Sequence, residues 1–144
     1  MPYAHPHPSF HFLVEAGFVR IGFTRVHLPR MEREIIRYRE SSDLSEVIQQ
    51  LPGLLRLSEC VLERGVMHTD NDFFMWMSTI NVGRVQLRDI TVKLLNDQHE
   101  PTTVWQLRDT FPTKLEWSVL DAQTSTVLIE TLHLSVASMY LPPT

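Results

Sequence analysis

Three histidines near the amino terminus are the first residues whose types and spacing could do chemistry. His5, His7 and His11 lie close together, and imidazole is a common metal ligand in proteins. The prolines between them hold the stretch open, because proline fixes the backbone dihedral φ, and no fourth ligand lies nearby. The sequence therefore predicts an extended arm over residues 1–9 and no native metal site.

A second cluster, His68, Asp70 and Asp72, could suggest a site for a hard cation such as Ca²⁺. A calcium loop needs carboxylates at every second position, a glycine and a more distant glutamate, and this segment lacks that pattern. The carboxylates stand where a helix is expected to begin, and negative charge suits that end of a helix. The segment is predicted to cap a helix, not to bind a metal.

The sequence contains no motif that indicates a nucleophile for covalent catalysis. Cys60 is the only cysteine, which excludes an intramolecular disulfide and a cysteine-built zinc site and fits a cytosolic folding compartment. It lies in an alternating segment, so we expect a small core residue and not a thiolate. The five glycines form no phosphate-binding loop, and no Gly-x-Ser-x-Gly motif is present. The sequence predicts no enzyme activity and no cofactor.

Composition indicates one globular domain, residues 1–144, since 43% of the residues are hydrophobic and 21% are charged. Residues 65–144 hold five basic and nine acidic residues, so this half carries the whole net charge of −4. A mildly acidic chain is a poor candidate for a nucleic-acid coat. The apolar runs are too short to span a membrane, and the amino terminus lacks the pattern of a secretory signal.

The elements that must position any functional residue are mostly strands, because apolar and polar residues alternate over much of the chain. We expect hairpins over residues 10–15 with 19–23 and over residues 85–95 with 103–111. Pro112 should end the second hairpin, and a last strand is expected over residues 127–140. The sum is an almost all-β chain with one short helix, folded as a barrel or sandwich.

Residues 32–64 form a charged stretch with few apolar residues. Residues 32–40 fit either a helix or a strand, and residues 57–64 alternate loosely. Between them, residues 51–54 read Leu-Pro-Gly-Leu, which is a turn signal. The stretch suggests a long hairpin with a loop, which would be marginal alone and would need another surface to lie against.

The helix is predicted over residues 70–82, ending at Gly83. One apolar face is formed by Phe73, Trp76, Met77 and Ile80, and we expect this face to pack on the domain's own core. Phe74 and Met75 lie off that face. The helix is therefore more apolar than one core contact requires, and Phe74 or Met75 should contact another chain.

Short motifs occur along the chain in a fixed order. They are Phe10-His11-Phe12-Leu13-Val14, Ile21-Gly22-Phe23, Tyr38-Arg39-Glu40, Leu51-Pro52-Gly53-Leu54, Glu63-Arg64-Gly65, Asp72-Phe73-Phe74-Met75-Trp76, Gly83, Arg88-Asp89, Trp105, Phe111-Pro112 with Lys114, and Ile129-Glu130-Thr131-Leu132. Each is weak alone. The ordered set, over about residues 9–140, resembles the tail tube proteins of contractile-tailed phages and of related extracellular contractile injection systems.

The resemblance implies an orthogonally packed β-sandwich or small barrel with one helix, similar in fold to the Hcp proteins of type VI secretion. It implies hexameric rings that stack into a hollow tube inside a contractile sheath. A spike or baseplate hub would lie at one end, and DNA or a protein toxin would pass through the lumen. The subunit would not insert into a membrane. It would assemble in the cytoplasm of the producing cell and become part of a phage tail or contractile particle.

The resemblance also implies where subunits meet, since in such proteins a long hairpin reaches onto neighbouring subunits. The expected interface residues are Tyr38, Arg39, Glu40, Leu51, Pro52, Leu54, Phe74 and Met75. Strands from each subunit would line the channel, and alternation assigns their faces. Ile90, Val92, Leu132 and Leu134 should face the core, so the expected channel residues are Asp89, Thr91, Lys93, Thr131, His133 and Ser135. Glu130 falls on the core face and needs a partner, for which Arg88 or Arg108 is expected.

Two other functions stay open at the sequence level. The family pattern commonly has glycine where Ser41 stands and Gly-Asn where Thr124 and Ser125 stand, so the chain could be a specialised first ring next to the spike. Alternatively, a monomeric β-barrel could bind a small ligand, which would need an apolar pocket with a few polar groups. A β-domain enzyme is a third option, which the missing catalytic groups argue against.

Overall fold

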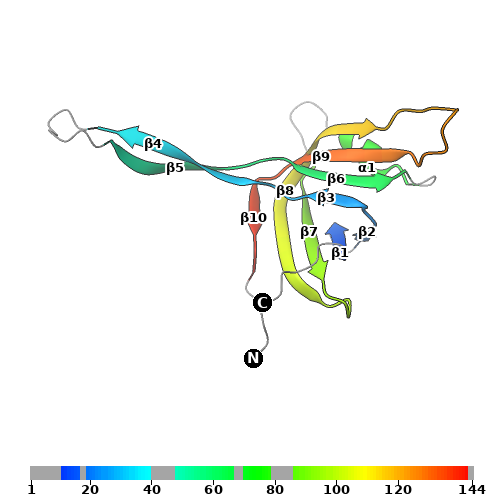
Figure 1. The fold of residues 1–144 in the computed structure, drawn as a ribbon, viewed down its shortest axis with the longest axis horizontal. Coiled ribbons are helices and arrows are strands. Elements are labelled where there is room, and N and C mark those ends of the chain that lie inside the picture. The colour runs from blue at the N-terminus through cyan, green and yellow to red at the C-terminus, as the bar shows by residue number, and fades with distance from the viewer. Residues whose placement is uncertain (1–10, 17–18, 40–47, 67–69, 79–85, 143–144) are drawn as a thin grey trace.

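The computed structural model describes residues 11–16, 19–39, 48–66, 70–78 and 86–142. Within these residues lie ten strands and one helix (Figure 1). Their bounds are β1 Phe12–Ala16, β2 Val19–Ile21, β3 Arg25–His27, β4 Met31–Tyr38, β5 Gln49–Leu57, β6 Cys60–Gly65, α1 Asp72–Ser78, β7 Arg88–Leu95, β8 Pro101–Trp117, β9 Ile129–Ser135 and β10 Ser138–Tyr140. The predicted β fold with one short helix is confirmed.

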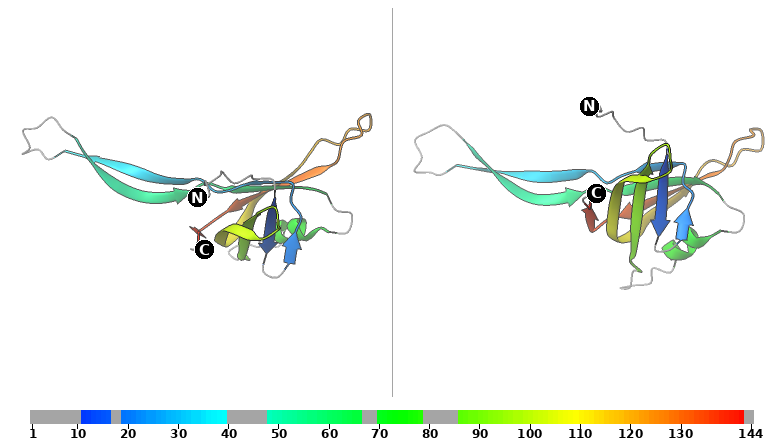
Figure 2. Two further views of the ribbon diagram at one scale, coloured as in Figure 1. Left: turned by 60° about the horizontal axis from the view of Figure 1, so that its bottom comes forward. Right: turned by 90° about the horizontal axis from the view of Figure 1, so that it is seen from below.

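The strands other than β4 and β5 form one eight-stranded sheet in the order β2-β1-β7-β8-β9-β6-β3, with β10 also paired to β8. The sheet folds over on itself along β8. Its first layer contains β2, β1, β7, β10 and the first half of β8, and its second layer contains the rest of β8 with β9, β6 and β3. The strands of the two layers cross (Figure 2, right), as predicted for an orthogonally packed sandwich.

A bulge at Asp109 turns β8 from the first layer into the second. Asp109 has a positive φ of 54°, in the left-handed region, which short polar side chains tolerate better than most. Its backbone N–H donates to the Asp89 carboxylate at 3.0 Å, and the Thr110 hydroxyl donates to the Arg88 carbonyl at 2.7 Å. The expectation that Pro112 ends this strand is wrong, because β8 continues past the bulge to Trp117.

The last strand is predicted as continuous over residues 127–140, and this is also wrong. β9 and β10 are separate strands, since β9 pairs with residues 111–117 of β8 and β10 pairs with residues 106–108. Between them, the N–H of Ala137 donates to the Arg108 carbonyl at 3.2 Å. The break lets the chain follow β8 around the corner from one layer to the other.

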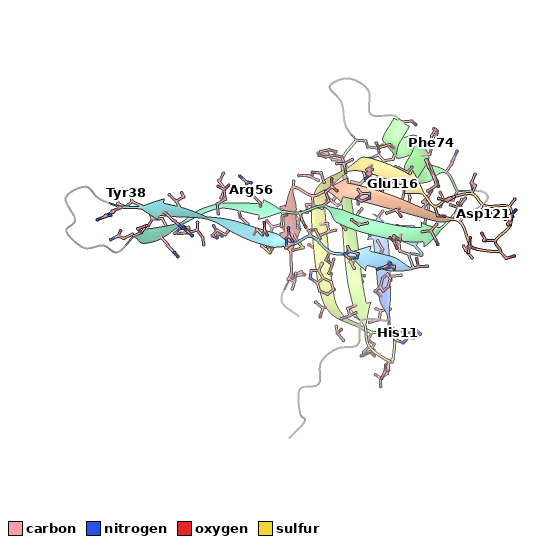
Figure 3. The ribbon with its side chains drawn as sticks, turned by 45° about the horizontal axis from the view of Figure 1, so that its top comes forward. His11, Tyr38, Arg56, Phe74, Glu116 and Asp121 are labelled. Carbon is pink, nitrogen blue, oxygen red and sulfur yellow. The ribbon has the colours of Figure 1, made fainter. Side chains whose placement is uncertain are left out.

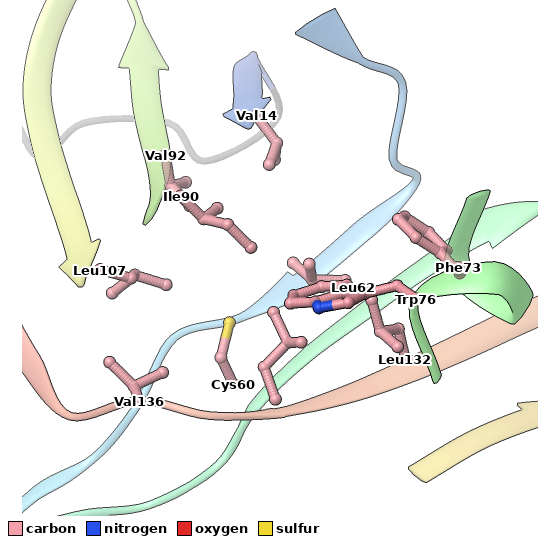
Figure 4. Packing of buried hydrophobic residues seen from close by; sticks show 11 residues of the cluster. Val14, Cys60, Leu62, Phe73, Trp76, Ile90, Val92, Leu107, Leu132 and Val136 are labelled. Atoms are coloured by element: carbon pink, nitrogen blue, oxygen red, sulfur yellow. The ribbon is translucent and has the colours of Figure 1, made fainter. Parts of the chain in front are cut away.

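The core lies between the two layers (Figure 4). The first layer contributes Val14, Ile90, Val92 and Leu107, and the second contributes Cys60, Leu62, Leu132 and Leu134. The predicted alternation is confirmed, because β9 buries Glu130, Leu132 and Leu134 and leaves the residues between them only half-buried. The outward faces of the two layers therefore point away from each other.

Helix α1 closes one end of the sandwich. Phe73 and Trp76 are buried and Met77 is half-buried, as predicted, while Ile80 and Gly83 lie outside the described residues. The Trp76 indole N–H donates to the Gln86 carbonyl at 2.8 Å. No helix in the described part of the chain has the length and apolarity that a membrane span requires.

Strands β4 and β5 form a two-stranded arm that projects from the sandwich (Figure 1). The predicted hairpin is confirmed over these strands, but its expected bounds of residues 32–64 are not, because β6 pairs with β9 inside the sandwich. The predicted turn at residues 51–54 is also wrong. Pro52 and Gly53 lie within β5 at a register shift opposite β4. A two-stranded ribbon has only edge strands, and these tolerate a proline.

Candidate inter-subunit surfaces

The arm exposes large apolar side chains on both of its faces. Paired residues share a face, so Ile35 lies beside Pro52 on one side and Ile36 lies beside Leu51 on the other. Leu54 is 72% exposed and Ile35 is 61% exposed. A ribbon with apolar side chains on both faces buries neither of them by itself. The arm is therefore shaped to be covered by another surface.

The expected interface residues of the arm are exposed wherever the structure describes them. Tyr38, Leu51, Pro52 and Leu54 lie in β4 or β5, and Arg39 follows β4 directly. Glu40 lies outside the described residues. Gly53 packs tightly against β4, since a Cβ there would lie 3.0 Å from the Glu34 Cβ. The Glu34 carboxylate forms an ion pair with Arg56 across the same ribbon.

The outer face of α1 carries the two apolar residues that sequence analysis assigned to a partner. Phe74 is 52% exposed and Met75 is 49% exposed, so neither is enclosed by its own chain. Their contact with a partner stays a prediction.

The loop between β8 and β9 is a third apolar surface, which sequence analysis missed. Val119 is 86% exposed, Leu120 is 82% exposed and Val127 is 72% exposed. Two hydrogen bonds fix the base of the loop, from Ser118 N–H to the Ile129 carbonyl and from Ile129 N–H to the Ser118 hydroxyl, both at 2.9 Å. The sequence feature that could have revealed this surface is the set of large apolar residues on either side of a short polar turn.

The outward face of the second layer is mostly polar. His133 lies between two carboxylates, with Nε2 3.0 Å from Glu116 Oε1 and Nδ1 3.4 Å from Glu59 Oε2. Lys114 contacts the same Glu116 at 3.2 Å. The Lys114 ammonium first, and then the His133 ring, lower the pKa of the Glu116 carboxyl. Thr131 and Ser135 flank His133 on this strand and are half-buried.

The outward face of the first layer carries the other predicted channel residues. Asp89 is exposed and accepts the bulge hydrogen bond from Asp109, and Thr91 is half-buried. Lys93 pairs with Glu15 of β1, at 3.3 Å between Nζ and Oε2. The two predicted groups therefore lie on opposite sides of the sandwich: Asp89, Thr91 and Lys93 on one layer, and Thr131, His133 and Ser135 on the other.

Beneath α1 lies a buried ion pair whose partners sequence analysis misassigned. Glu130 pairs with Arg64 at 2.7 Å, not with Arg88 or Arg108. Arg64 is 4% exposed and lies opposite Glu130 in the β6–β9 register. The guanidinium also contacts Asp70 at 3.1 Å and stands 3.9 Å from the centre of the Phe73 ring. The cluster ties the start of α1 to the second layer.

The expected partners of Glu130 are used elsewhere. Arg88 pairs with Asp72 at 2.7 Å and lies over the Trp76 ring, and Arg108 lies over the Tyr140 ring at 4.8 Å. Both arginines thus hold neighbouring elements in place on the surface.

Cys60 and Asp70, whose side chains could in principle take part in chemistry, have structural roles. Cys60 is fully buried, and burial raises the pKa of its thiol to about 12, so it is not poised as a nucleophile. Asp70 accepts the Asp72 N–H at 3.0 Å, as predicted for a helix cap. This hydrogen bond first, then the Arg64 guanidinium, lowers the pKa of the Asp70 carboxyl.

The ring of His11 lies 5.4 Å from that of His99, while His5, His7 and His68 lie outside the described residues.

The arrangement of a projecting arm, an exposed helix face and a two-layered sandwich can be compared with known proteins. The family described as T4-like virus tail tube protein gp19 matches residues 8–140. The chain belongs to this tail tube family. It is a structural tube subunit of the contractile injection type, as the sequence resemblance indicated. No curated protein sequence matches the chain significantly.

Solved structures agree with the family. The sheath-tube complex of the extracellular contractile injection system PVC contains a chain with a TM-score of 0.88 and 25% identity, covering 97% of this chain and 93% of that one. The baseplate of the anti-feeding prophage AFP contains one with a TM-score of 0.83 and 26% identity, covering 97% of each chain. Hcp1 from Flavobacterium johnsoniae matches with a TM-score of 0.56 and 13% identity, covering 90% and 93%. This last likeness shows a shared Hcp-like fold alone.

Proposed function

We propose that this tube subunit assembles into hexameric rings and that the rings stack into a hollow tube. The observation that carries the proposal is the arm, which exposes apolar side chains on both faces and has no core of its own. A second copy of the chain would cover these side chains. The similar AFP baseplate structure is described as 6-fold symmetrised, which supports six copies in a ring.

The channel wall is proposed to be the outward face of the second layer. Within the described residues, β3 and residues 113–117 of β8 have a neighbouring strand on one side only. These two open edges can join the edges of adjacent copies, which would give a continuous sheet and remove exposed edges. The corresponding lining residues are Thr131, His133 and Ser135. Asp89, Thr91 and Lys93 would then face outward.

This wall is suited to a sliding cargo. Its groups are mostly polar, with Val61, Phe111 and Ile129 half-buried among them. Its charges are mixed, because Lys114 and His133 stand beside Glu59 and Glu116. Paired charges of both signs leave no strongly basic surface that would bind DNA. Either DNA or a protein toxin could therefore pass without a large adhesive patch.

Further partners follow from the position of a tube in such a particle. A contractile sheath would surround the rings, and a spike or baseplate hub would close one end. Phe74 and Met75 on α1 are proposed to contact an adjacent subunit or the sheath. Assembly would take place in the cytoplasm of the producing cell, as part of either a phage tail or an extracellular contractile particle.

We propose that the chain is the main tube subunit; the alternative is a subunit of the first ring beside the baseplate. The sequence identities of 25% to the sheath-tube chain and 26% to the baseplate chain favour neither position over the other. We expect a main tube subunit to form both rings and tubes, and a first-ring subunit to form rings alone.

Size and shape of the purified protein test the proposal. We expect elution far above the mass of one chain and hollow rings or tubes in negative-stain electron microscopy. A protein that elutes as a single chain at high concentration would instead fit a monomeric small-ligand module. Rings without tubes would identify the first-ring alternative.

A further inference from the structure

The fold brings a fourth histidine to the three near the amino terminus. The sequence around His5, His7 and His11 offers no further ligand, but the centres of the His11 and His99 rings lie 5.4 Å apart in the structure. His11 directly precedes β1, and His99 lies in the turn between β7 and β8. In Figure 3, His11 lies at the end of the sandwich opposite Phe74 of α1. Four of the chain's seven histidines are thus in this pair or within six residues of it.

The separation of the two rings suits a shared metal ion. Zinc ligands are arranged as a tetrahedron with an imidazole nitrogen about 2.0–2.1 Å from the metal, so the centres of two rings on one Zn²⁺ lie roughly 5 Å apart. The His11 and His99 rings are close to that separation. His99 is exposed and His11 is half-buried, so a cation in solution can reach both side chains.

The backbone on both sides of the pair is held by hydrogen bonds. Asn96 fixes the β7–β8 turn, since its side-chain oxygen accepts the Glu100 N–H and its carbonyl accepts the His99 N–H, both at 2.9 Å. The Leu95 N–H donates to the His11 carbonyl at 2.8 Å. His99 has a φ of 62°, in a region that few residues other than glycine occupy. The turn therefore presents an imidazole at a position where a glycine would be less strained.

Further ligands must come from outside the described residues or from water. Within the part of the chain that the structure describes, no three His, Cys, Asp or Glu side chains are arranged to hold a metal. His7 and His5 precede His11 by four and six residues, and a residue spans up to about 3.3–3.6 Å of extended chain, so both can reach a cation at His11. Pro6 and Pro8 alternate with these histidines and lower the conformational entropy that is lost when the segment is fixed.

We infer that His11 and His99 form the centre of a binding site for a divalent transition-metal cation of the zinc type, which His5 and His7 complete. Neutral imidazoles suit zinc, copper and nickel, whereas magnesium and calcium prefer oxygen ligands. The bound cation ties residues 1–10 to the β7–β8 turn. The site lies within one chain, so it does not depend on the proposed assembly into rings and tubes.

Isothermal titration calorimetry of the untagged protein with zinc chloride tests the site. We expect one Zn²⁺ bound per chain, and no binding of Mg²⁺ at the same concentration. Co²⁺ in place of Zn²⁺ should give the intense visible absorption of tetrahedral coordination. Binding should weaken as the pH falls, because a histidine ligand must be neutral. A wild-type protein that binds no Zn²⁺ would overturn the inference and show that the two rings only pack against each other.

A pair of matched variants locates the site. His99→Asn should weaken zinc binding by at least about tenfold through the loss of one metal–nitrogen bond, and asparagine tolerates the positive φ at this position. His27→Asn, which replaces an exposed histidine of β3, should bind Zn²⁺ like the wild type. Wild-type affinity in His99→Asn would overturn the site, since the amino-terminal histidines would then bind the metal without the turn.

The contribution of the amino-terminal segment is tested separately. His5→Asn with His7→Asn should weaken zinc binding and abolish the tetrahedral Co²⁺ spectrum, because water would replace the two imidazoles. An unchanged affinity and spectrum in this double variant would overturn the assignment of these two ligands. Electron microscopy of the same variants reads out the proposed function independently, and we expect them to form rings and tubes like the wild type.

Discussion

Arg64 and Glu130 are the residues on which the attachment of α1 to the sandwich depends. Both are buried, and the Arg64 guanidinium also reaches Asp70 and Phe73. Removing one member of a buried ion pair costs about 3–5 kcal/mol when the other charge is left without compensation. Because Asp70 still contacts Arg64, we expect Glu130→Ala to lower the free energy of unfolding by an amount near the lower end of that range in denaturant titrations.

The matched control replaces both charges with apolar side chains of similar size. Arg64→Met with Glu130→Leu should recover much of the loss, because no buried charge remains. If the double variant is no more stable than Glu130→Ala, packing and not charge compensation explains the effect.

Asp70 gives the start of α1 a pH dependence. Its carboxyl pKa is lowered in the folded chain from an ordinary value of 3.8, so its stabilisation is fully present above that value and is lost as the pH falls through the folded-state pKa. Asp70→Asn keeps a capping oxygen and removes the charge. We expect it to cost roughly 0.3–1 kcal/mol at pH 7, a modest amount because Asp70 is exposed to solvent.

Denaturant titrations of both proteins across the pH range check this expectation. The difference between them should shrink as the pH falls below 3.8. A difference that stays constant into strong acid would contradict a role for the Asp70 charge.

Sequence alone could place Glu130 on the core face but could not find its partner. Alternation along one strand fixes which face a residue occupies. The partner depends on which strand lies alongside, and β6 becomes the neighbour of β9 only through the order of the sheet. Arg64 is far from Glu130 in the chain, so no local pattern connects them.

At the scale of elements, the arm shows why local turn signals can mislead. Pro-Gly within residues 51–54 favours a turn, yet both residues lie in β5 opposite β4. The predicted end of the hairpin at residue 64 is also wrong, because only a short break separates β5 from β6 and no local signal marks it. Pairing with β9, which draws β6 into the sandwich, is a long-range property.

The arm should be weakly protected in a free subunit. Two strands with exposed faces bury little apolar surface, so their hydrogen bonds open readily. In hydrogen exchange on a dissociated monomer, amides of β4 and β5 should exchange fast while those of β6 and β9 stay protected. Assembly should slow exchange in the arm. Strong protection of the arm in the monomer would count against its dependence on a neighbour.

For the whole molecule, the layered fold determines which predicted surfaces can act together. The sequence predicted the faces of β7 and β9 correctly from alternation. It could not show that these faces lie on opposite sides of the sandwich, because that depends on the fold of the sheet along β8. One subunit can therefore offer one face to a lumen and the other to its surroundings.

A cryo-electron microscopy map of the assembled protein tests the central claim most directly. We predict stacked hexameric rings around a hollow channel, with Thr131, His133 and Ser135 facing the lumen and the arm crossing the joint between rings. A map in which Ile90, Val92 and Leu134 line the lumen, or a protein that remains a single chain under all conditions, would contradict this account.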